Sequence, residues 1–182
     1  FGLAFRLALM CSIATGAMAP LITREFTIAH ERGDLAEMRR LFRRSVPLFY
    51  SLAAFFSCFI FIQADRLEPV FGETFRQAGP AIRIMALYPL AQVYGQLSGA
   101  VFFASGRTAL YRNIGVSLFI AGAAAAYFLM ASPQNHRLNA GALGLAVKMT
   151  ALSFIALNVQ LYFNARMLSM PLGYYLVHQI VC

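Results

Sequence analysis

Charged residues are scarce in this chain, and their scarcity excludes several classes of protein. They make up 12% of the 182 residues, whereas apolar residues make up 60%. A soluble domain usually carries about 25% charged and about 45–50% apolar residues. The composition therefore argues against a soluble globular domain, a disordered chain and a disulfide-rich scaffold, and it indicates an integral membrane protein.

The sequence also lacks the residue patterns of metal centres and of common enzymes. Its three cysteines form no CxxC pair, and its three histidines are isolated from one another. We therefore expect no metal site. There is no HExxH motif, no Ser-His-Asp set and no glycine-rich phosphate loop, so we expect neither a cofactor nor an enzymatic activity.

Acidic residues are missing from most of the chain. All seven lie at or before Glu73, and the basic residues cluster between apolar runs. The net charge of +8 alone would suit nucleic-acid binding, but this distribution is instead typical of a membrane protein with basic cytoplasmic loops. We therefore expect membrane lipids, and not nucleic acid, among the partners.

Five apolar runs are long enough to cross the ~30 Å hydrocarbon core, which takes about 20 helical residues. The runs are continuous rather than alternating, and helices satisfy their own backbone hydrogen bonds in lipid. We predict an all-α fold, a polytopic transmembrane helix bundle that forms a single partial domain over residues 1–182. Because Phe1 lies inside an apolar run, we expect further sequence before it and after Cys182. The predicted spans are about 1–22, 46–64, 80–103, 113–131 and 141–163.

Basic residues in the loops give the predicted orientation. Segments 23–45 and 104–112 and the tail after the last span together hold nine of them. The intervening loops 65–79 and 132–139 hold three. Because basic loops favour the cytoplasm, we predict that segment 23–45 is cytoplasmic in a multi-pass protein of the plasma membrane.

Segment 24–45 has a helical pattern of its own. Gly33 can end one short helix, and Asp34 can cap the next, with Glu37 as its capping-box partner. Apolar side chains then recur at helical spacing, with basic side chains on the other face. We predict a short amphipathic helix on the inner leaflet, which fixes topology rather than binding a specific ligand; a solvated connector is the alternative. The predicted membrane-surface residues are Arg39, Arg40, Arg43 and Arg44.

Lys148 and Arg83 are cations inside predicted spans. Lys148 lies about 12 Å along the last span at ~1.5 Å per residue. Charges at such depth usually face the bundle interior or a wet cavity. Arg83 lies about one turn into the third span. Both side chains could instead extend to the membrane interface or form structural pairs.

Uncharged polar residues accompany these cations. Gln92 and Gln96 share one face of the third span, and Asn158 shares a stripe with Lys148. The glutamine face could also serve helix–helix hydrogen bonding. No acidic residue lies within any predicted span, which suits an anionic substrate rather than proton or cation coupling. The predicted substrate-binding residues are Lys148, Arg83, Gln92, Gln96 and Asn158.

Three stretches carry a resemblance to a known family: LEPVFGETFRQAGPAIRIMAL (67–87), ASGRTALYRN (104–113) and NAGALGLAVKMTALSF (139–154). Their order resembles the later half of the polysaccharide exporters, the lipid-linked oligosaccharide flippases of the multidrug/oligosaccharidyl-lipid/polysaccharide superfamily. The resemblance implies a transporter of about 12 to 14 helices in two lobes around a central, often cationic cavity. This chain would belong to the second lobe, and the missing N-terminal lobe of the same chain would be its partner.

The resemblance also implies a function. Such proteins move lipid-linked sugars, which are anionic through their pyrophosphate, across the bacterial inner membrane by rocking their lobes. An alternative is a cation-coupled multidrug or metabolite antiporter of the same superfamily, with its carboxylate outside this segment. A third hypothesis is a membrane-embedded glycosyltransferase or polymerase, or a structural subunit. The short outer loops disfavour this hypothesis.

Overall fold

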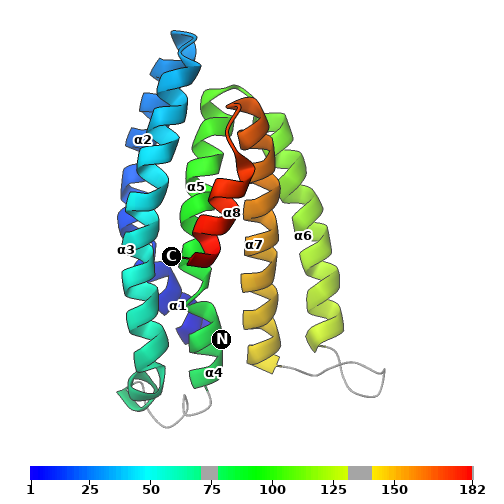
Figure 1. Cartoon of the computed structure of the whole chain (residues 1–182). Helices are drawn as coiled ribbons and strands as arrows, with labels where there is room; N and C mark the ends of the chain where they lie inside the picture. The colour runs from blue at the N-terminus through cyan, green and yellow to red at the C-terminus, as the bar shows by residue number, and fades with distance from the viewer. Residues whose placement is uncertain (71–77, 131–140, 182) are drawn as a thin grey trace.

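The computed structural model describes residues 1–70, 78–130 and 141–181, and every regular element in these ranges is an α-helix. This confirms the predicted all-α class. The helices run lengthwise as a bundle, with the short α8 folded back along it (Figure 1). They are α1 (Gly2–Cys11), α2 (Ile13–Glu31), α3 (Leu35–Val70), α4 (Gly79–Met85), α5 (Tyr88–Ala104), α6 (Thr108–Met130), α7 (Gly141–Met167) and α8 (Leu172–Val181).

Three helical segments of the described residues are long and apolar enough to cross a membrane. They are Leu35–Arg66, Thr108–Leu129 and Gly141–Met167. A fourth span is possible if Gly2–Cys11 and Thr15–Glu31, which meet at an angle of 47°, act as one. These segments indicate a membrane protein, whereas the predicted count of five spans is not confirmed.

The first helical pair departs from the predicted span at 1–22. The chain bends at Ser12, and α2 then continues to Glu31. The hydroxyls of Thr23 and Thr27 donate to the carbonyls of Ala19 and Thr23, at 2.8 and 2.9 Å. These threonines therefore fit within the helix, and α2 ends only where a glycine permits a turn.

That turn joins α2 to α3 as the sequence predicted. Gly33 adopts a φ of 69°, a left-handed conformation that favours glycine after a helix. The Asp34 carboxylate accepts a hydrogen bond from the backbone N–H of Glu37 at 2.8 Å, which caps the first turn of α3. The predicted cap at Asp34 is therefore confirmed.

The helix that follows differs from the prediction. We expected a separate amphipathic helix within 24–45 and then a span at 46–64, but α3 is continuous from Leu35 to Val70. No glycine interrupts it, and Pro47 does not break it. At ~1.5 Å per residue α3 is about 54 Å long. The arginine-rich segment is therefore the first part of a long helix rather than a surface helix.

The predicted third span, 80–103, is broken into α4 and α5. The break at Ala86 and Leu87 has a local cause, because Pro89 lacks an N–H and its ring conflicts with the carbonyl four residues earlier, at Met85. Pro89 instead lies in the first turn of α5, where proline is well tolerated. The break places α4 against α1, α3 and α7 at one end of the bundle.

The last two predicted spans correspond to α6 and α7. Helix α6 covers 113–131 as far as Met130, and residue 131 lies outside the described residues. Helix α7 contains all of 141–163 and continues to Met167. The turns after α2 and α5 and the end of α7 lie at the same end of the bundle (Figure 1), as the alternation of basic loops predicted.

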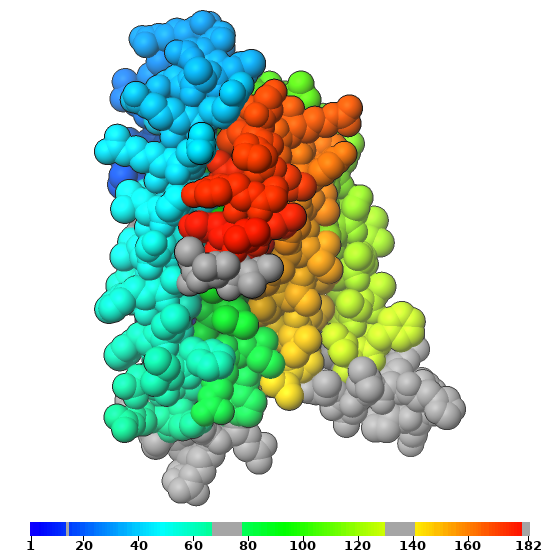
Figure 2. Space-filling model, in the orientation of Figure 1, coloured from blue at the N-terminus to red at the C-terminus, as the bar shows by residue number. Residues whose placement is uncertain are grey.

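Helix α8 was not predicted. Pro171 precedes it, and the chain then reverses along the bundle between α3 and α7 (Figure 1). Figure 2 shows α8 filling the upper part of the space between α3 and α7, with α4 and α5 visible below it. The main core joins α2, α3, α5, α7 and α8 around Tyr94, Phe42 and Tyr175, and a smaller cluster joins α1 and α4.

Candidate functional site

A polar cleft lies between α5, α6 and α7. Its volume is about 180 Å³. Helix α5 supplies two glutamines, α6 a tyrosine, and α7 a serine and a third glutamine. The lining residues are Ala91, Gln92, Gly95, Gln96, Tyr111, Ser153, Ala156, Leu157 and Gln160.

Helical spacing explains why these side chains meet. Gln92 and Gln96 lie four residues apart on α5, and Ser153 and Gln160 lie seven apart on α7, so each pair shares one face of its helix. Gly95 leaves room between the glutamines, since a Cβ there would meet nothing within 4 Å. One face of α5 and one face of α7 therefore enclose the cleft.

Two amide oxygens in the cleft are left without hydrogen bonds. The Oε1 atoms of Gln96 and Gln160 are buried and have no partner among the described residues. A buried oxygen without a partner costs about 1–3 kcal/mol, so a hydroxyl group that reached either oxygen would satisfy it.

The cleft continues into a larger groove between α6 and α7. The groove has a volume of about 460 Å³ and shares Tyr111, Ala156 and Gln160 with the cleft. Arg112 lies at the start of its α6 side, and the remaining lining is mostly apolar. The other lining residues are Gly115, Val116, Leu118 and Phe119.

The predicted site residues do not form one cluster. Gln92 and Gln96 lie together in the cleft. Arg83 instead forms an ion pair with Asp65 of α3, and the side chains are 42% and 65% exposed. This contact supports the structural alternative for Arg83, and its predicted binding role stays a prediction.

Asn158 and Lys148 lie apart from the cleft. The Asn158 amide donates to the Phe154 carbonyl at 2.8 Å and accepts a hydrogen bond from Gln179 of α8 at 3.4 Å. Lys148 is half-buried, and no described residue forms a hydrogen bond or ion pair with it. It points away from the cleft, because Lys148 and Leu157 lie on opposite faces of α7.

Three residues of the cleft were not predicted from the sequence, namely Gln160, Tyr111 and Ser153. A signal for two of them was present, since Ser153 and Gln160 are polar residues seven apart in an apolar helix. Tyr111 could not be assigned in that way, because its position depends on how α6 packs beside α5. A Cβ at Gly99 of α5 would lie 3.4 Å from the Tyr111 hydroxyl oxygen, so this glycine permits the close approach.

A second polar cluster holds α8 in place. The Tyr94 hydroxyl and His178 Nδ1 share a hydrogen bond of 2.7 Å. The Tyr50 hydroxyl donates to the backbone carbonyl of Gln179 at 3.3 Å, and the Tyr50 and His178 rings lie 5.0 Å apart. Together with the Gln179–Asn158 contact, these bonds join α8 to α3, α5 and α7.

We expect this docking to weaken in acid. Burial lowers the pKa of His178 from its ordinary value of 6.5, so the neutral form dominates in the folded protein at pH 7. Its stabilising contribution is fully present above the ordinary pKa and is lost as pH falls below that value. The melting temperature in detergent should therefore drop between pH 7 and pH 5.

The His178→Gln variant tests the source of that drop. We expect a flatter pH profile for this variant, whereas His30→Gln should keep the profile of the parent protein. The rings that pack against His178 are those of Tyr50, Tyr94 and Tyr174. An unchanged profile in His178→Gln would contradict the assignment.

Comparison of the chain with protein-family models, with curated proteins and with solved structures found no match. The features from which a function can be inferred are therefore the apolar helices, the polar cleft and the distribution of charge.

Proposed function

We propose that this chain is part of a membrane transporter, a flippase that moves a lipid-linked oligosaccharide or polysaccharide precursor across the bacterial inner membrane. The chain would supply helices of the second lobe, and transport would proceed by alternating access. The observation that carries this proposal is the polar cleft between α5, α6 and α7, in a chain that is otherwise strongly apolar.

The chemistry of the cleft supports a sugar ligand. Its polar side chains are three amides and two hydroxyl groups, and none of its lining residues is charged. An amide both donates and accepts hydrogen bonds, and a hydroxyl does the same. Such groups match the hydroxyls of a sugar, whose ring has no charge of its own to be neutralised.

The size of the cleft limits what it can hold. Sites for drug-sized ligands usually measure about 300–1,000 Å³, whereas the cleft measures about 180 Å³. We therefore assign it to one sugar unit of a larger substrate. The adjoining groove would hold neighbouring parts, with Arg112 available to an anionic group and apolar side chains to a lipid.

The cation in α7 has a separate role in this proposal. Lys148 is half-buried without a partner among the described residues, and an intramembrane cation of this kind attracts anionic groups. We expect Lys148→Ala in the full-length protein to reduce export of surface polysaccharide about tenfold, which corresponds to ~1.4 kcal/mol. Lys148→Arg should retain most of the export, since it keeps the charge.

The direct test of function uses the full-length protein in liposomes with a fluorescent lipid-linked oligosaccharide. We expect labelled lipid to reach the opposite leaflet faster than in protein-free liposomes. Efflux of cationic drugs that depends on an ion gradient, without movement of the sugar lipid, would contradict the proposal and favour an antiporter. Unchanged export by Lys148→Ala, at equal protein levels, would contradict the role of Lys148 alone.

A further inference from the structure

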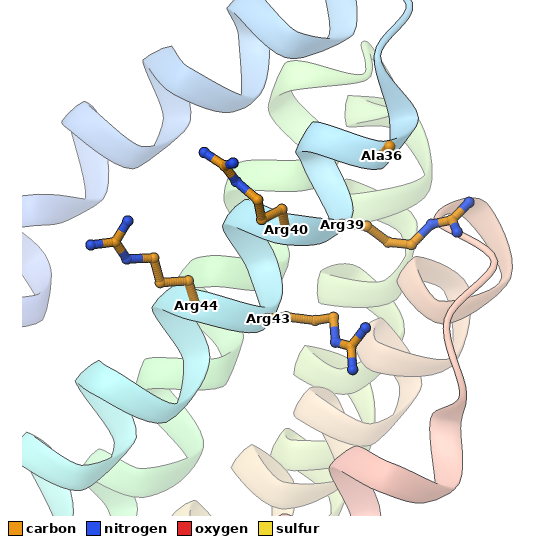
Figure 3. Close-up of a pocket in the computed structure, with 5 residues that line it drawn as sticks. All are labelled: Ala36, Arg39, Arg40, Arg43 and Arg44. Carbon is orange, nitrogen blue, oxygen red and sulfur yellow. The ribbon is translucent and has the colours of Figure 1, made fainter.

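Four arginines surround the first turns of α3. Together with Ala36 they line a hollow of about 470 Å³ (Figure 3). Figure 3 shows that they divide into two pairs: Arg39 and Arg43 extend to one side of the helix, and Arg40 and Arg44 extend to the other. Each pair is spaced four residues apart, which places the two side chains next to each other on one face.

The two pairs have different surroundings. On the α2 side, Arg40 Nε forms an ion pair with Glu37 Oε2 at 3.1 Å. Arg40 also borders a hollow whose lining includes Glu25 and Asp34. Acidic groups of α2, of α3 and of the turn between them therefore already balance part of the arginine charge on this side.

On the side of Arg39 and Arg43, no acidic group balances the arginine charge among the described residues. Neither arginine has an ion-pair partner among the described residues, and the Nε atom of Arg39 is buried without a hydrogen bond. No acidic residue occurs anywhere in α7 or α8, because the last acidic residue of the chain is Glu73. A buried guanidinium N–H without an acceptor is costly, so this side favours an added anion.

Helix α8 packs against α3 on this side. The ring of Tyr175 contacts the ring of Phe42 at 5.4 Å, and Tyr175 is 1% exposed. Burial raises the pKa of Tyr175 to about 12, and the nearby Arg43 guanidinium opposes that shift. Figure 3 shows Arg39 and Arg43 extending to the side of α3 on which α7 and α8 lie, so the pair is next to a second helix.

Arg39 and Arg43 lie just before the uncharged stretch of α3. Arg44 is the last charged residue before an uncharged stretch that runs from Ser45 to Ala64. Basic residues just outside an apolar span lie at the level of lipid head groups. The pair therefore lies where a phosphoryl group attached to a lipid tail would be found, rather than in open solvent.

We propose that Arg39 and Arg43 form a binding site for the phosphoryl head group of an anionic phospholipid, between α3 and α8. Two adjacent guanidinium groups supply parallel N–H donors that suit phosphate oxygens. Arg40 and Arg44 supply only surface charge. This assignment differs from the expectation that the arginines fix topology without binding a specific ligand, and it does not depend on the proposed transport function.

The test uses the matched pairs on the same helix. The full-length protein is placed in nanodiscs that contain phosphatidylglycerol and phosphatidylcholine, and retained lipids are counted by native mass spectrometry. We expect the parent protein to prefer phosphatidylglycerol about tenfold. Arg39→Gln with Arg43→Gln should abolish the preference, and Arg40→Gln with Arg44→Gln should keep most of it.

Several outcomes would overturn the proposal. Equal losses from the two double variants would show general surface charge, and the absence of a preference in the parent protein would show no site. Displacement of phosphatidylglycerol by millimolar inorganic phosphate would show a site for a free anion rather than a lipid. If the first double variant does not fold, Arg43→Gln alone must still lose at least half of the preference.

Discussion

Replacing Gln96 and Gln160 together with methionine should lower transport at least tenfold without destabilising the protein. The two Oε1 atoms belong to glutamines that line the cleft, and they are buried without a hydrogen-bond partner among the described residues. If they bind substrate hydroxyls, their removal costs at least ~1.4 kcal/mol of ligand binding. Removing unpaired buried oxygens is at the same time neutral or favourable for folding. A loss of function with equal or higher stability is therefore the expected signature.

The measurement pairs a transport assay in liposomes with thermal unfolding in detergent. Gln63→Met on α3 is the matched control, since Gln63 lies outside the cleft. It should leave transport unchanged. If the double variant instead transports normally, the cleft is not a substrate site. If it unfolds at a much lower temperature, the glutamines instead serve helix–helix hydrogen bonding.

Replacing Gly122 with leucine should separate α6 from α7. A Cβ at Gly122 would lie only 3.0 Å from Leu152 Cδ1, and a leucine would extend further into the same space. Overpacking of this kind costs typically 1–3 kcal/mol. Helix α6 contacts α7 far more than it contacts α5, so this interface holds α6 to the bundle. We expect a large drop in melting temperature and loss of transport.

Two further variants make that expectation specific. Gly115→Leu changes the same helix at a position where a Cβ meets nothing within 4 Å, and it should leave the melting temperature nearly unchanged. Leu152→Ala, combined with Gly122→Leu, removes the opposing atoms and should recover part of the lost stability. A double variant no more stable than Gly122→Leu would contradict the packing explanation.

The sequence predicted those parts of the fold that depend on local physics. Continuous apolar runs marked α6 and α7, and Gly33 with Asp34 marked the turn before α3. The same local rules could also have predicted the break before Pro89 and the presence of α8. Pro89 indicated a kink in the third span, yet the span was predicted as one helix that runs through it. Pro171 followed by an apolar and aromatic stretch could have indicated α8.

The candidate site was less predictable, because it depends on which helices meet. Gln92 and Gln96 share a face of α5, and spacing alone revealed this. That their face meets Gln160 of α7 depends on the packing of two helices separated by α6 in the chain. The partners of Arg83 and Asn158 are likewise distant in sequence, since they are Asp65 and Gln179.

The central claim is that a sugar unit of the substrate occupies the cleft between α5, α6 and α7. It is tested most directly by a photoreactive residue at Ser153, which lines the cleft, in the full-length protein with radiolabelled lipid-linked oligosaccharide. Ala151 is the control position, since it is exposed on another face of α7. We predict labelled crosslinks from position 153 that excess unlabelled substrate suppresses, and few from position 151. Equal labelling from both positions, or labelling that excess substrate does not suppress, would contradict the account.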